Sequence, residues 1–150
     1  MVEIQAREFL EFVRSKRERV RRMEEALAES KARAEHVSGL QIGERVQSSN
    51  KASIDAMLAA IEEEAGRLEE AQAELAAEVD KAQEMVNLIR DEAAMWHVLW
   101  ERYIIGASWD EVAKHTSYGR RTVFRLAERG YSAINKKMAL RGTSWHSKMC

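Results

Sequence analysis

The chain has 150 residues, of which 45% are hydrophobic and 33% charged, and its formal net charge is −1. These values are ordinary for a soluble, helix-rich protein of one domain or two small ones. No run of eighteen apolar residues occurs and charged residues begin at Glu3, so we expect neither a spanning helix nor a signal peptide, and a cytosolic location. A lone cysteine, Cys150, cannot form an internal disulfide, and the absence of proline favours long helices.

The charge is distributed unevenly along the chain. Residues 1–90 carry 14 Lys and Arg against 19 Asp and Glu, whereas residues 91–150 carry 10 against 6. From Gly119 onward there are eight basic residues and one acidic residue, Glu128. Such a block is typical of a surface that meets nucleic acid or an acidic partner, although a solvated basic helix has the same composition.

Two segments show heptad spacing of apolar residues, which predicts two long helices. The first register is interrupted by Lys16 and Ser30, and its apolar members are Ala6, Phe9, Val13, Val20, Met23, Leu27, Ala34 and Val37. The second register predicts a helix over 54–89 and consists of Ile54, Leu58, Ile61, Ala65, Leu68, Gln72, Leu75, Val79, Ala82, Val86 and Ile89. Its single polar member either fixes register and partner number or lies where the helix is partly exposed. Between the helices, glycine, serine and asparagine predict a loop over Ser38–Ser53.

One long helix cannot bury its own apolar stripe, so the first helix is expected to fold back on the second as an antiparallel hairpin. The charges agree, because residues 7–33 have nine basic and six acidic side chains while residues 54–84 have two and ten. Small seam residues bury little area, so self-association is also expected, with a homodimer favoured among homo-oligomers.

The C-terminal third contains the elements of a second, compact core. We expect a helix over Asp91–Ile105 that ends at Gly106, a helix from Trp109 to about His115, and a helix from about Arg120 to Ala139. Ser108 followed by Glu111 is a capping box for the middle helix. A short helix, a break at "TSYG" and a basic helix form a helix-turn-helix pattern, so the predicted all-α fold is a coiled-coil hairpin (1–90), a helix-turn-helix DNA-binding domain (91–140) and a tail (141–150).

The basic helix carries the candidate DNA-binding residues. If Val123 and Leu126 face the core, the side chains expected to read base edges are Arg120, Arg121, Thr122 and Arg125. The side chains expected to position the protein on the duplex, mainly through phosphates, are Lys114, Tyr118, Arg129, Lys136 and Lys137. Phe124 packs either on the core or on DNA.

The segment "SWDEVAKHTSYGRRTVFRLAERGYSAI" resembles the helix-turn-helix of region four in primary sigma factors. That register implies core positions at Val112, Ala113, Val123, Leu126 and Ile134 and DNA-facing positions at the arginines and threonine named above. Over almost the whole chain, "GERVQSS", "RYIIGASWDEVA" and "YGRRTVFRL" are similar to small phage and prophage proteins related to ArpU-type late transcriptional regulators. The family name implies a regulator, acting in the host bacterium. Gly130 departs from the alanine-rich helix of that family and predicts a helix of doubtful straightness.

Catalytic and cofactor motifs are absent from the sequence. The four histidines, His36, His97, His115 and His146, are scattered, and His146 with Cys150 gives too few ligands for zinc, so we expect no enzyme activity, cofactor or metal site. In the Gly43–Ser49 loop, the residues that either bind a partner or only close the turn are Arg45, Gln47, Ser48 and Ser49. Three functions stay open: a DNA-binding transcriptional regulator whose hairpin either dimerises or touches RNA polymerase, a small-terminase-like packaging protein, and a polymerase-binding protein that never binds DNA.

Overall fold

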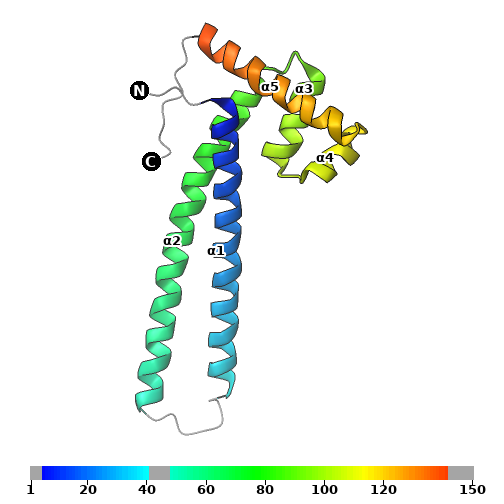
Figure 1. The fold of residues 1–150 in the computed structure, drawn as a ribbon. Helices are drawn as coiled ribbons and strands as arrows, with labels where there is room; N and C mark the ends of the chain where they lie inside the picture. The colour runs from blue at the N-terminus through cyan, green and yellow to red at the C-terminus, as the bar shows by residue number, and fades with distance from the viewer. Residues whose placement is uncertain (1–4, 41–47, 142–150) are drawn as a thin grey trace. The chain divides into compact units, whose positions relative to one another are not determined.

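A computed structural model describes residues 5–40 and 48–141, and these residues form helices and no strands (Figure 1). The elements in chain order are α1 (Ala6–Leu40), α2 (Ser48–Asn87), α3 (Ala93–Leu99), a π-helical segment η1 (Trp100–Ile105), α4 (Trp109–Thr116) and α5 (Arg120–Leu140). The predicted all-α class is therefore confirmed. None of the described helices has the length and apolar character needed to cross a membrane.

The chain divides into two compact units, Arg17–Leu75 on the one hand and Met1–Lys16 with Ala76–Cys150 on the other. The predicted division at residue 90 does not coincide with this one. Residues 76–90 and the first turns of α1 belong with the C-terminal helices, and the reason is their burial. Side chains that are fully buried in that unit include Leu10 and Val13 from α1 and Met85 and Val86 from α2.

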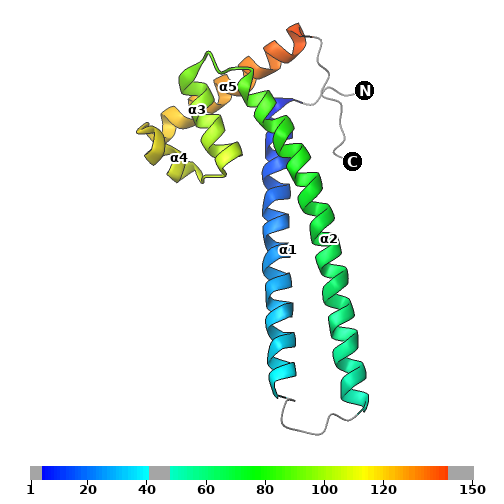
Figure 2. The same cartoon turned by 180° about the vertical axis from the view of Figure 1, so that it is seen from behind.

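In the Arg17–Leu75 unit, α1 and α2 lie side by side and run antiparallel (Figures 1 and 2). Val20, Leu27 and Leu68 form the buried centre, which confirms the heptad positions predicted for them. The apolar side chains packed around that centre are Met23, Ile61, Ala65, Ala71 and Leu75. Gln72 lies at the surface, where its Nε2 donates a hydrogen bond to Glu24 Oε1 at 2.9 Å.

The predicted loop over Ser38–Ser53 was too long. Helix α1 continues to Leu40 and α2 already begins at Ser48. Serine and asparagine are favoured at the first positions of a helix, because their side chains accept hydrogen bonds from its free N–H groups. The cluster Ser48-Ser49-Asn50 therefore marks the start of a helix rather than the middle of a loop.

The other unit is built around α5, which packs closely against α3. Its fully or nearly fully buried side chains come from every helix of the unit: Ala6, Phe9, Leu10, Val13, Ala82, Met85, Val86, Ile89, Val98, Leu99, Tyr103, Val112, Val123, Ala127, Tyr131, Ile134 and Met138. Gly130 is buried on the same face of α5, and a Cβ atom there would lie 2.7 Å from Leu99 Cδ1. Helix α5 continues through Gly130 without interruption, and the missing side chain leaves room for Leu99 of α3 at this position.

Gly130→Ala should therefore destabilise the protein although alanine is the better helix former. The intrinsic gain is about 1 kcal/mol, and displacing the fully buried Leu99 is expected to outweigh it for a net loss of about 1–2 kcal/mol. Gly66→Ala in α2 is the matched control, since nothing lies within 4 Å of the added Cβ. It should stabilise by roughly 0.5–1 kcal/mol. Urea unfolding of both variants measures the two effects, and a stabilised Gly130→Ala protein would contradict the close approach.

Candidate nucleic-acid interface

Helix α4 begins and ends with specific backbone interactions. The Glu111 backbone N–H donates to Ser108 Oγ at 3.2 Å, which confirms Ser108 as the predicted N-cap. At the other end, Ser117 adopts a left-handed conformation with φ of 62°. Gly119 has an ordinary φ of −66° and starts α5. The break predicted at "TSYG" is present, but Ser117 rather than the glycine reverses the chain.

The buried sides of α4 and α5 determine which residues face outward. Val112, Val123 and Ile134 are fully buried, and Ala113 and Leu126 are half-buried, as the predicted core register requires. Successive residues of a helix are separated by 100°, so the side of α5 opposite Val123 and Ile134 faces away from the core.

Four cations occupy that outer side of α5. These exposed residues, called the basic face below, are Arg121, Arg125, Arg129 and Lys136. They recur at intervals of four and seven, and at 1.5 Å per residue they extend over roughly 22 Å of helix. Among the residues that the structure describes, none of the four forms an ion pair or a hydrogen bond, so their donors are available to an external anion.

The remaining predicted DNA-binding residues have different surroundings. Lys114 and Tyr118 are exposed and Thr122 is half-buried. Arg120 lies 3.5 Å from Asp110 Oδ1, with both side chains exposed. Such a surface pair is weak and exchanges readily for another anion.

Lys137 does not share the basic face. Its Nζ donates to Asp91 Oδ1 at 2.7 Å, and its side chain is only 34% exposed. The hydrogen bond from Lys137 lowers the pKa of the Asp91 carboxyl, so the carboxylate of this ion pair stays charged to lower pH than an isolated aspartate would. The predicted phosphate contact of Lys137 therefore competes with a partner inside the chain, whereas that of Lys136 does not.

Two neighbouring aromatic rings, each with an arginine over it, connect η1, α4 and the first turns of α5. The Arg102 guanidinium lies 4.4 Å from the Trp109 ring centre, the Trp109 and Phe124 ring centres lie 5.1 Å apart, and the Arg120 guanidinium lies 5.8 Å from the Phe124 ring centre. Phe124 thus packs on Trp109 and still exposes 39% of its surface. The protein contact expected for Phe124 is therefore present, and its contact with DNA stays a prediction.

Sequence reasoning missed Arg102. Its Nη1 donates to the Ala107 carbonyl at 3.3 Å, and its buried Nε has no hydrogen-bond partner within the described chain. Burial lowers the pKa of this guanidinium, with the neighbouring Arg14 as a second cause, but arginine stays charged. The Arg102 side chain therefore connects η1 to α4 through its contact with the Trp109 ring.

The N-terminal part of α1 forms polar contacts with α5, with η1 and with the residues that follow η1. The Ala6 backbone N–H donates to Asn135 Oδ1 at 2.8 Å, and Arg7 lies 3.3 Å from Glu128. Arg14 Nη1 donates to the carbonyls of Arg102 and Ala107 at 3.2 and 3.4 Å. A helix start has free N–H groups, and here a side chain of α5 accepts from one of them.

A buried hydrogen-bond chain completes this attachment. Tyr103 OH donates to Glu11 Oε1 at 2.6 Å, and the hydroxyls of Tyr103 and Tyr131 lie 2.5 Å apart. Because the single hydroxyl proton of Tyr103 goes to Glu11, Tyr131 is the donor to Tyr103. Burial raises the pKa of both phenols above the ordinary value.

These raised pKa values predict a loss of stability in alkali. Above about pH 10 the unfolded phenols lose their protons while Tyr103 and Tyr131 keep theirs, so the folded state binds more protons and the free energy of unfolding falls as pH rises. The expected slope is roughly 1.4 kcal/mol per pH unit for each phenol. Urea unfolding at pH 8 to 11 measures it. Tyr131→Phe should make the profile shallower. Equal slopes in the wild type and Tyr131→Phe would contradict this account.

Two scattered histidines meet at one carboxylate. His115 Nδ1 lies 3.0 Å from Glu101 Oε2, and His97 Nε2 lies 3.5 Å from Glu101 Oε1. These three residues come from α4, η1 and α3, so Glu101 links these three elements. Among the described residues, no three His, Cys, Asp or Glu side chains are placed to hold a metal ion.

Other predicted residues cannot be placed. Arg45 and Gln47, together with His146 and Cys150, lie outside the described residues. Ser48 and Ser49 open α2, but their side chains are also outside the description. No protein-family model, curated protein or solved structure matches this chain.

Proposed function

We propose that the chain is a sequence-specific DNA-binding regulator whose α4 and α5 form a helix-turn-helix, with the antiparallel pair of α1 and α2 as a hairpin module. The basic face of α5 is the observation that carries this proposal. It places four unpaired cations on one side of a helix that is secured on its other side by a buried core. Helix dimensions suit the DNA major groove, which admits one helix.

The roles of the basic residues differ along α5. Arg121 and Arg125 lie in the first two turns, where a recognition helix usually presents side chains to base edges. Arg129 and Lys136 lie further along the same face and suit contacts to the phosphate backbone. Arg120 joins the first group once Asp110 is exchanged for a phosphate or a guanine, since the pair is exposed.

The likeness to sigma region four and to ArpU-type late regulators supports transcription regulation as the role, in a phage or prophage and in the host cytoplasm. Packaging by a small-terminase-like ring and binding to RNA polymerase without DNA are the competing functions. The unpaired arginines favour DNA, because a protein interface of this kind would bury charged side chains that it must first desolvate.

The test compares cations on and off the basic face. After selection of a bound sequence from random duplexes, Arg121→Ala and Arg125→Ala should each weaken specific binding by about 1–3 kcal/mol and relax the preference at individual bases. Lys136→Ala should weaken selected and scrambled duplexes alike and reduce the salt dependence by about one unit of slope. Fluorescence anisotropy at two salt concentrations separates these outcomes.

Arg67→Ala is the matched control, since Arg67 is an exposed cation of α2 in the Arg17–Leu75 unit. It should leave affinity, specificity and salt slope unchanged. Helix content by circular dichroism must be equal in all variants. Wild-type affinity in Arg121→Ala and Arg125→Ala would remove α5 as a recognition helix and favour the polymerase-binding alternative.

A further inference from the structure

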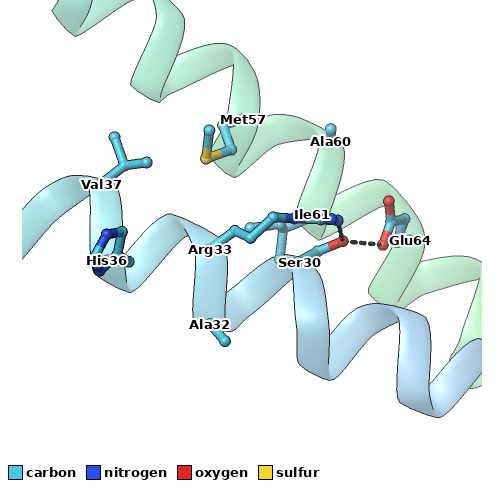
Figure 3. A pocket seen from close by; sticks show the side chains of 9 residues that line it. All are labelled: Ser30, Ala32, Arg33, His36, Val37, Met57, Ala60, Ile61 and Glu64. Atoms are coloured by element: carbon cyan, nitrogen blue, oxygen red, sulfur yellow. Dashed lines mark hydrogen bonds between the residues drawn. The ribbon is translucent and has the colours of Figure 1, made fainter.

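An open groove lies between α1 and α2 within the Arg17–Leu75 unit, near the C-terminal end of α1 and the N-terminal end of α2 (Figure 3). Its volume is about 580 Å³. The residues that line it are Ser30, Ala32, Arg33, His36, Val37, Met57, Ala60, Ile61 and Glu64. Most of these are apolar, and Met57 and Val37 point into the space between the helices (Figure 3).

The apolar residues of the heptad seam on α2 become more exposed to solvent toward this groove. Leu68 is 8% exposed, Ile61 is half-buried and Leu58 is 47% exposed. Met57 and Val37 are half-buried as well. In a closed two-helix pair, seam residues at this spacing would be buried equally. The pair therefore retains apolar surface that its own two helices do not cover.

The polar residues of the groove are already bonded to one another. Arg33 Nη2 donates to Ser30 Oγ at 3.4 Å, and Ser30 Oγ donates to Glu64 Oε2 at 3.3 Å (Figure 3). These two hydrogen bonds connect the two helices at one end of the groove. The apolar part beyond it, centred on Met57 and Val37, is what a partner could cover without leaving these polar groups unpaired.

The charges of the two helices indicate which partner fits. Residues 17–37 of α1 carry six basic and five acidic side chains, whereas residues 51–75 of α2 carry two basic and seven acidic ones. A strongly acidic α2 is best covered by a helix of opposite charge balance, and α1 of a second copy is such a helix. Contact of α2 with another α2 is disfavoured by the same charges.

We propose that the groove is the docking surface for a second copy of this chain, which forms a four-helix homodimer through the ends of the two pairs. A two-fold axis parallel to the helices brings α1 of each copy beside α2 of the other, and a closed two-fold contact needs only one self-complementary patch. Met57 of each copy then packs against Val37 of its partner. This inference stands independently of DNA binding, which uses the other unit.

Met57→Glu in the full chain tests the proposal by placing a charge on each side of the contact. The wild-type protein should be a dimer with a Kd on the order of micromolar or below, and Met57→Glu should weaken it by at least about 100-fold. Ala59→Glu is the matched control, because Ala59 is exposed on α2, is not a groove residue and lies about 200° around the helix from Met57. Sedimentation equilibrium measures both, with circular dichroism to confirm equal helix content.

A crosslink provides a readout that does not depend on folding energy. In a Cys150→Ser background, a mixture of the single variants Met57→Cys and Val37→Cys should yield a disulfide-linked heterodimer on mild oxidation, whereas Ala59→Cys mixed with Val37→Cys should not. A wild-type protein that is monomeric at 100 micromolar would overturn the proposal, as would a Met57→Glu dimer as stable as the wild type. A larger ring with no crosslink between Met57→Cys and Val37→Cys would overturn it too. None of these results would alter the expected effect of Arg121→Ala on DNA binding.

Discussion

The position of α5 depends on the buried hydrogen-bond chain from Tyr131 through Tyr103 to Glu11. These three residues lie on α5, on η1 and on the first turns of α1, and 120 residues separate the ends of the chain of bonds. A buried hydroxyl without a partner costs about 1–3 kcal/mol, so each of the three groups requires the other two. Because the bonds join α5 to two other elements on its inner side, the orientation of its outer side is fixed, and with it the direction of the basic face.

The cations of this unit fall into two groups: those that form hydrogen bonds within the described chain and those of the basic face, whose side chains do not. Arg14 and Arg102 donate hydrogen bonds to main-chain carbonyls, and Lys137 donates one to Asp91. All three lie at joints between elements, where a hydrogen bond from a cation offsets the desolvation of both partners. Arg121, Arg125 and Arg129 have no such role, although holding three like charges on adjacent turns destabilises a helix slightly. A bound anion would relieve this repulsion, which is consistent with the function proposed for this surface.

Local signals in the sequence predicted most of the fold. The capping serine at 108, the helix stop at Gly106 and the heptad positions Leu27 and Leu68 were all predicted, because each depends on residues a few positions apart. What could not be predicted depends on partners far along the chain. The role of Gly130 requires knowledge that Leu99 lies against it, and the role of Arg102 requires Trp109 and Ala107 together. For the basic face, the sequence predicted Arg121 and Arg125 correctly as outward, while Lys137 and Lys136 looked equivalent until Asp91 was placed.

The location of the domain division follows from the same long-range contacts. Helix periodicity continues from residue 54 to residue 89 without a change, so nothing in the pattern marks Leu75 as the last residue of one unit. What changes there is the kind of neighbour. Leu75 packs on the Val20–Leu68 centre, while Met85 and Ile89 are fully buried in the core that includes Val13 and Ile134. The apolar stripe of α2 thus contributes to two cores in succession, and the packing of α5 depends on residues 6–16 and 76–90 as much as on residues adjacent to it in sequence. Since those segments supply Phe9, Val13, Met85 and Ile89, we expect the smallest independently folded unit that contains α5 to include both parts of this discontinuous region.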